Sequence, residues 1–268
     1  MRLALIALLA LSGCHEEVAA ASVPAADGAA LHDPALRERG PARHDPHAYE
    51  AALARVEARR EALGRRLRAA DSGAERAEVR NEARAYALQA MREVIFPAWM
   101  GTPWGLGPNS TPTRPHQPDT VIACGYFISS ALENLGLRLD TRFRFAQAPA
   151  LHAQRSLAPA RADLHRYFSV PGDRLARDIV ALGEGLYIIG LNNHIAFVDV
   201  RAGEARLVHA SYTDEQVVID EPLATAQVIA NSRTAGYFVT PLLQDERLID
   251  RWLRGEPVAL QKLGVDGA

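Results

Sequence analysis

The sequence predicts an α+β protein, and three observations support this class. Residues 49–95 carry apolar side chains at helical spacing, and residues 121–135, which end at Gly136, have the pattern of a further helix. Short β-type segments joined by turn residues follow between residues 185 and 242. Helices that come before an antiparallel meander, instead of alternating with its strands, are typical of the α+β class.

The composition excludes several classes of protein. The chain has 268 residues, of which 48% are hydrophobic and 23% are charged, and its formal net charge is -2. These values are ordinary for a globular protein and leave no basic surplus for binding nucleic acid. No apolar stretch after residue 13 is long enough for a transmembrane helix.

The first 13 residues have the pattern of an export signal. Arg2 precedes an apolar run, residues 3–11, which is too short to span a bilayer. The ending Leu-Ser-Gly-Cys resembles a bacterial lipobox, in which the cysteine becomes the lipidated first residue of the mature protein. The resemblance implies that residues 1–13 are a lipoprotein signal peptide. It also implies that Cys14 carries lipid and holds the protein on a membrane of the bacterial cell envelope, facing the periplasm or the exterior.

Two regions are expected before the second half of the chain. Residues 14–45 are rich in Ala, Pro, Asp and Glu without periodicity, which predicts a disordered tether. The residues 44–47, His-Asp-Pro-His, could hold a metal, but without a packed scaffold a solvated linker is the better interpretation. Residues 46–96 are expected to form a helical region with a break near Ser72, and Pro97 is expected to end its second helix. The apolar positions at helical spacing are Leu53, Val56, Leu63, Leu67, Val79, Ala83, Tyr86, Ala87, Ala90, Met91 and Val94.

Residues 97–268 are expected to form the main domain. A Gly/Pro-rich loop leads to a helix at 121–135 that carries Cys124 in its first turn, and residues 142–173 have the pattern of an irregular insertion. The predicted strands are 185–191, 194–200, 206–211, 217–220 and 237–242, and a closing helix is predicted at 245–253.

Cys124 is the strongest candidate for a functional residue. If Cys14 is lipidated, Cys124 has no partner for a disulfide in an exported chain. The first turn of a helix stabilises a thiolate through its free N–H groups, and a nearby imidazole does so more strongly. A reactive thiol with a pKa well below that of free cysteine is therefore expected. The alternative is a buried structural cysteine.

Two histidines can supply the imidazole. His194 begins one predicted strand and His209 ends the next, so that pairing through the turn at 202–203 brings them close to opposite each other. One histidine acting as base and the other orienting it is the logic of a Cys-His-polar triad. Satisfied core histidines are one alternative, and a zinc ion held by Cys124, His194 and His209 is another. Asp199 could close a different triad, but five positions after His194 it points to the opposite face of the strand.

The order of these motifs resembles that of the NlpC-type cell-wall cysteine peptidases, which have a compact papain-like fold. In that superfamily a loop Gly-x-Pro-Tyr-x-x-Gly-Gly precedes an Asp-Cys-Ser-Gly nucleophile helix, and His-Val-Gly-Ile and Ile-His-Ala strands follow. The corresponding segments here are 101–107 (Gly-Thr-Pro-Trp-Gly-Leu-Gly), 123–126 (Ala-Cys-Gly-Tyr), 194–197 (His-Ile-Ala-Phe) and 208–211 (Val-His-Ala-Ser).

The resemblance implies a papain-like catalytic domain at 97–268 and a role for each matching residue. Cys124 is then the nucleophile, His194 the general base and His209 the orienting third member. Trp104, Gly125 and Tyr126 are then substrate-binding residues. Trp104 and Gly125 depart from the usual tyrosine and serine, and Ala123 replaces the acidic residue before the cysteine.

The resemblance implies a cysteine hydrolase that cleaves amide bonds in peptidoglycan peptides through a thioester intermediate. No cofactor and no metal are expected. The expected partners are peptidoglycan peptides or another amide substrate, and the membrane through the lipid on Cys14. Two alternatives remain, namely a papain-like or transglutaminase-like thiol acyltransferase and a non-catalytic lipoprotein that binds the cell wall.

Overall fold

The computed structural model describes residues 45–261 except 159, 161–162 and 214. The predicted signal peptide, Cys14 and the predicted tether up to residue 44 lie outside the described residues. Asp45 accepts hydrogen bonds from the backbone N–H groups of His47 and Ala48, at 2.9 and 3.0 Å, and so caps the first described helix.

The predicted helical region forms two helices that pack against each other, with the predicted break near Ser72. α2 (Pro46–Ala69) ends before Ser72, whose side chain caps α3 (Gly73–Ala90) in a capping box with Glu75. The predicted apolar positions on both helices are buried. Burial of these two stripes against the rest of the protein, more than helix propensity, holds the pair in place.

Pro97 does not end the second helix, so this prediction was wrong. α3 continues into a π-helical segment, η1 (Met91–Ile95), and then into α4 (Phe96–Trp99). Pro97 occupies the first turn of α4, where a missing N–H group and a fixed φ are tolerated. The chain leaves the helix only after Trp99.

A six-stranded antiparallel sheet occupies the second half of the chain. Its order is β1-β6-β2-β3-β4-β5. Tight turns at 192–193 and 202–203 join β2 to β3 and β3 to β4, with positive φ at Asn193, Ala202 and Gly203. The strands are β1 (His165–Tyr167), β2 (Gly185–Leu191), β3 (His194–Arg201), β4 (Glu204–Ala210), β5 (Val218–Pro222) and β6 (Tyr237–Leu242). The α+β class and the five predicted strands are therefore confirmed, with small shifts at their ends.

The stretch 142–173 is not irregular, which corrects a second prediction. It contains the short helices α6 (Arg142–Gln147) and α7 (Ala150–Leu157) and the edge strand β1. Helices of six and eight residues span too few turns to give a clear periodic signal, which explains the error. The remaining elements are α5 (Cys124–Asn134), α8 (Gly172–Val180), the 3-10 turn η3 (Leu223–Thr225), α9 (Gln227–Ser232) and α10 (Glu246–Arg254).

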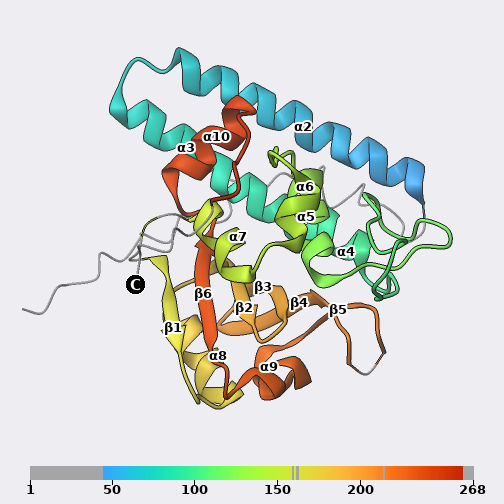
Figure 1. Ribbon diagram of the computed structural model, residues 1–268. Coiled ribbons are helices and arrows are strands. Elements are labelled where there is room, and N and C mark those ends of the chain that lie inside the picture. Colours follow the sequence, from blue (N-terminus) through green and yellow to red (C-terminus); the bar gives the residue numbers. More distant parts are fainter. Residues whose placement is uncertain (1–44, 159, 161–162, 214, 262–268) are drawn as a thin grey trace, which may run out of the picture. The chain divides into compact units, whose positions relative to one another are not determined.

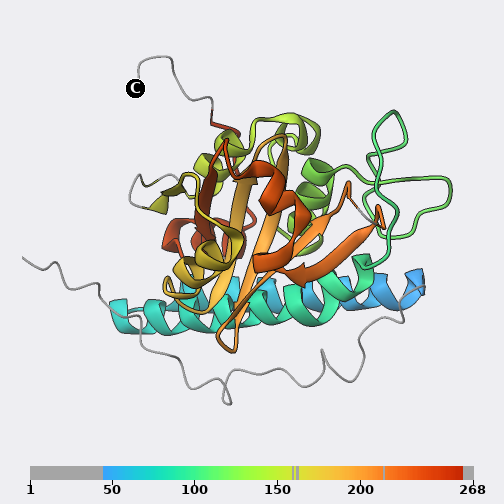
Figure 2. The ribbon, with the colours of Figure 1, turned by 90° about the horizontal axis from the view of Figure 1, so that it is seen from below.

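Helices cover both faces of the sheet (Figures 1 and 2). Side chains such as Phe197 and Val208 share one hydrophobic core with α2, α3, α5 and α10. Alternate side chains such as Val198 and Leu207 share a second core with α8 and α9. The predicted boundary at residue 96 falls within the first core, so the helical region packs as part of the same unit. None of the helices in the described part of the chain is long and apolar enough to cross a bilayer.

Candidate active site

Cys124 is the first residue of α5. Its predecessor Ala123 has extended backbone angles and no side chain that could cap the helix. The first backbone hydrogen bond of the helix runs from the N–H of Phe127 to the carbonyl oxygen of Ala123, at 2.9 Å. The N–H groups of Cys124 and Gly125 precede this bond, so they are free to stabilise negative charge at the helix start.

The Cys124 thiol is a free, part-buried group beside β3. Burial raises the pKa of the Cys124 thiol, while the backbone N–H groups of Ile195, Gly125 and Cys124 itself lower it by less. The expectation of a depressed thiol pKa was therefore wrong, because no charged side chain of the described residues offsets the loss of solvent. The sulfur contacts the backbone N–H of Ile195, the residue that follows His194 in β3.

His194 and His209 form a buried hydrogen-bonded pair. Nε2 of His194 lies 2.9 Å from Nδ1 of His209, and the two rings are nearly perpendicular, at 81°. The ladder pairs Phe197 with Val208, and continuing this register places His209 opposite Ala196. The histidines are therefore diagonal neighbours on one face of the sheet, not direct partners, and the predicted proximity is confirmed.

Burial and the neighbouring His209 lower the pKa of His194 to about 3. His194 is therefore neutral at neutral pH, and Nδ1, the ring atom that does not contact His209, has no hydrogen-bond partner among the described residues. Among the described residues no hydrogen bond joins the Cys124 thiol to His194. Such contacts are often long before substrate binds.

The candidate site lies at one rim of the sheet. Cys124 packs against the core that contains Ile195, whereas Ala196, next to both histidines on their face, belongs to the second core. Because His194 is the first residue of β3, the two faces adjoin at this point. The thiol and the histidine pair therefore approach the rim from different sides of the sheet.

Glu221 completes the polar chain, and the sequence analysis missed it. Its Oε1 atom lies 2.8 Å from Nε2 of His209. His209 pairs with Ile219 in the β4–β5 ladder, so Glu221, two residues further on, is a diagonal neighbour on the same face. The alternation along β5 was the signal that could have found it.

Tyr212 and Trp104 form an aromatic pair next to His194. The ring of Tyr212, also missed from sequence, lies 5.3 Å from that of His194, and Trp104 lies 6.2 Å from Tyr212. The loop that carries Trp104 is held beside the segment that precedes Cys124 because the N–H of Ile122 donates to the carbonyl oxygen of Pro103, at 2.7 Å. Trp104 therefore contacts Tyr212, which in turn contacts His194.

Gly125 and Tyr126 are placed against α6. A Cβ atom on Gly125 would lie 2.0 Å from the carbonyl oxygen of Ala146, so only glycine fits where α6 meets α5. The ring of Tyr126 packs on Phe143, at 5.8 Å, and under the guanidinium of Arg142. The buried Tyr126 hydroxyl has no hydrogen-bond partner among the described residues. These contacts explain the two residues by packing, and their predicted role in substrate binding stays a prediction.

Asp199 lies away from the site, as predicted. Its carboxylate is 1% exposed and accepts hydrogen bonds from Nε and Nη2 of Arg92, at 2.9 and 2.6 Å. This ion pair ties β3 to η1 on the face opposite the histidines. Asp199 therefore does not close a triad with His194.

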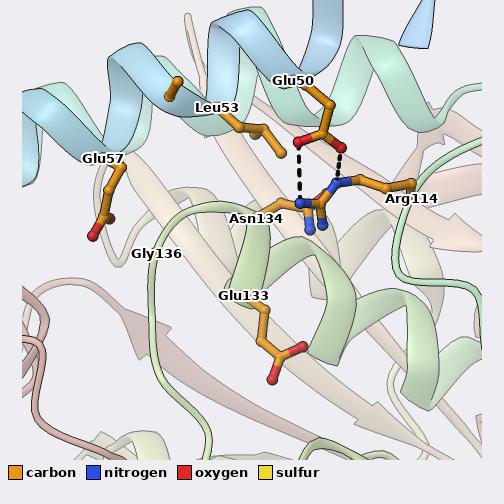
Figure 3. A pocket seen from close by; sticks show the side chains of 8 residues that line it. Glu50, Leu53, Glu57, Arg114, Glu133, Asn134 and Gly136 are labelled. Atoms are coloured by element: carbon orange, nitrogen blue, oxygen red, sulfur yellow. Dashed lines mark hydrogen bonds and ion pairs between the residues drawn. The ribbon is translucent and has the colours of Figure 1, made fainter. Parts of the chain in front are cut away.

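A separate pocket of about 310 Å³ lies at the other end of α5 (Figure 3). Glu50 and Arg114 form an ion pair across it. Asn134, the last residue of α5, lines the pocket, whereas Cys124 is the first residue of that helix. An 11-residue helix is about 16 Å long, so this pocket does not belong to the thiol site.

The described residues contain no group of three or more His, Cys, Asp and Glu side chains placed to hold a metal ion. Both ring nitrogens of His209 are engaged, one by His194 and one by Glu221. A zinc ion held by Cys124, His194 and His209 would have to break one of these two hydrogen bonds of His209. Comparisons with known proteins gave no match to a family model, to a curated protein or to a solved structure.

Proposed function

We propose that this protein is a cysteine hydrolase with an NlpC-type, papain-like core that cleaves amide bonds in peptidoglycan peptides. In this proposal Cys124 is the nucleophile, His194 the general base and His209 the residue that orients the base. The observation that carries it is the buried hydrogen bond between His194 and His209. The residue after His194 in β3 is Ile195, whose backbone N–H contacts the thiol. In a Cys-His-polar triad the third residue holds the base by a hydrogen bond of this kind.

The proposed reaction proceeds in two halves. Sγ of Cys124 attacks the amide carbon while its proton passes to His194, and the tetrahedral oxyanion forms near the free N–H groups at the start of α5. The C–N bond then breaks, the leaving amine takes the proton from His194, and a thioester remains. Water, deprotonated by His194, attacks the thioester and releases the acid and the free thiol.

The thiol and its base are both uncharged at rest in this proposal. Burial raises the pKa of Cys124 and lowers that of His194, so both effects favour a neutral thiol beside a neutral imidazole. Proton transfer is then coupled to the attack on the bound substrate. This arrangement corresponds to general-base activation and does not need a preformed thiolate–imidazolium pair.

The location of the protein is part of the same proposal. The leader ending in Cys14 supports lipidation and anchoring to a membrane of the cell envelope, where peptidoglycan is accessible. The test compares native protein with Cys14→Ser by mass and by membrane fractionation. The variant is expected to remain unprocessed or to become soluble. Unchanged mass and unchanged membrane association would contradict the anchor.

The decisive experiment is digestion of purified peptidoglycan with native protein, Cys124→Ala and the control Gly73→Ala, followed by mass analysis of the fragments. Gly73 starts α3 and a Cβ there meets nothing within 4 Å. We expect new amine and carboxyl ends with the native and control proteins only. Products joined to an added amine would favour the acyltransferase. Binding of peptidoglycan without cleavage would favour a wall-binding lipoprotein and contradict the hydrolase.

A further inference from the structure

Glu221 does not contact His194, yet it ends the hydrogen-bonded chain that runs through His209 to His194. We infer that Glu221 is a positioning residue that sets the direction of every hydrogen bond in this chain and so keeps Nδ1 of His194 unprotonated. This inference rests on the proposed function in one respect, the role of His194 as the base. The direction of the hydrogen bonds can be measured independently of any activity.

The direction follows from what each atom can donate or accept. A carboxylate has only acceptor atoms, so His209 donates Nε2–H to Glu221 across 2.8 Å. In the neutral form of His209 the ring has one N–H, so its Nδ1 is an acceptor. His194 therefore donates Nε2–H to it across 2.9 Å. Nδ1 of His194 is left with a lone pair.

Among the described residues, His209 is the side chain that hydrogen-bonds to the carboxylate of Glu221. Its neighbour Asp220 takes the two nearby guanidinium groups, with Arg206 at 2.7 Å and Arg201 at 3.0 Å. Successive residues of a strand point to opposite faces, so these ion pairs form on the side away from His209. No described arginine or lysine forms an ion pair with Glu221.

The direction of these hydrogen bonds matters because both histidines are buried. His209 has no exposed surface and His194 is 4% exposed, so solvent cannot supply a substitute acceptor to His209. Without Glu221 the proton of His209 could sit on Nδ1 and be donated to Nε2 of His194. The single proton of His194 would then occupy Nδ1, the atom that must accept the proton of the thiol. Such a tautomer is inactive as a base.

The charge of Glu221 adds a second effect. When His194 accepts the thiol proton it becomes an imidazolium in a buried site, and that cation is unfavourable by itself. The negative charge of Glu221, one imidazole away, stabilises it through the polarised hydrogen bonds of His209. Glutamine at this position would keep an acceptor oxygen and remove the charge, so Glu221→Gln separates the two effects.

The test measures the tautomers directly by NMR of the full-length protein with ¹⁵N-labelled histidine side chains. His194→Gln and His209→Gln variants assign the signals. In native protein we expect both histidines to carry the proton on Nε2 and none on Nδ1. In Glu221→Leu we expect a substantial Nδ1–H population on both rings. Glu204→Gln, an exposed carboxylate on the same strand as His209, is the control and should leave the spectrum unchanged.

Activity is the second measurement. Turnover of Glu221→Leu should fall by about 10- to 100-fold with little change in KM, and Glu221→Gln should lose less. A native His194 with its proton on Nδ1 would overturn the inference even if the leucine variant failed to fold. Unchanged tautomers in a folded Glu221→Leu would also overturn it. If the tautomers follow Glu221 but native protein cleaves no peptidoglycan, the inference stands and the proposed function fails.

Discussion

Nε2 of His194 hydrogen-bonds to Nδ1 of His209 although the β3–β4 register places His209 opposite Ala196. Diagonal neighbours on one face of a sheet are about 7–8 Å apart at the backbone, a distance that two imidazole side chains can bridge. The pair therefore depends on the register. A slip of one residue would move one histidine to the other face and separate them.

The first prediction concerns His209. Replacement by Ala should lower turnover strongly and leave substrate binding nearly unchanged, because the orienting contact to His194 is lost. His209→Gln and His209→Asn, which still donate and accept hydrogen bonds, should retain more turnover than His209→Ala. The measurement is kcat and KM for each variant on the substrate that native protein cleaves. Equal turnover in all variants would remove His209 from the mechanism.

The second prediction concerns the ion pair of Asp199 with Arg92. Asp199→Ala should lower the free energy of unfolding by about 3 kcal/mol, because the guanidinium loses its buried partner. Turnover per folded molecule should be unchanged, since Asp199 points away from the histidines. The double variant Asp199→Leu with Arg92→Met should recover most of the stability. A selective loss of turnover in stable Asp199→Ala would support a Cys-His-Asp triad.

The third prediction concerns the reactivity of the thiol. Burial raises the pKa of Cys124, so the alkylation rate of native protein should rise with pH to a midpoint above that of cysteine in a short peptide. The same thiol in urea-unfolded protein should return to the ordinary midpoint. His194→Gln should change the native profile little. Fast alkylation that persists below neutral pH would show that a thiolate–imidazolium pair exists at rest.

The fourth prediction tests the contact between α5 and α6. Gly125→Ala should lower the free energy of unfolding by roughly 1–3 kcal/mol, because the new methyl group would collide with the carbonyl oxygen of Ala146. Gly73→Ala is the matched control and should be neutral or stabilising by up to about 1 kcal/mol. Urea titrations of the three proteins measure the difference. Equal stability of Gly125→Ala and native protein would contradict the close approach.

The fifth prediction concerns pH and the stability contributed by His194. Burial and His209 lower the pKa of His194 from 6.5 to about 3, so between these values the unfolded chain binds a proton that the folded protein excludes. The free energy of unfolding should therefore fall as the pH decreases through this window. The slope due to His194 is at most about 1.4 kcal/mol per pH unit. His194→Gln should show a correspondingly shallower dependence between pH 6.5 and 5, and identical slopes would contradict a buried neutral imidazole.

The pattern of side chains along the chain was sufficient to predict many, but not all, of the local elements. β2 has the predicted bounds, residues 185–191, because its apolar run is flanked by turn residues, and Ser72 marks the break between the helices. The proximity of His194 and His209 was also predictable, since a short turn at 202–203 limits the register of the two strands.

Side-chain patterns along the chain predicted the first two helices, the helix that carries Cys124 and five of the six strands. They also placed a thiol at a helix start before two histidines on neighbouring strands. The surroundings of those groups depend on the folded protein. Glu221 reaches His209 only because β5 pairs with β4, and burial raises the pKa of the thiol against the expectation from its helix position. Periodicity and turn chemistry act over a few neighbouring residues, so they are readable along the chain. Burial and diagonal contacts depend on segments that meet only in the folded protein, so no local sequence pattern predicts them.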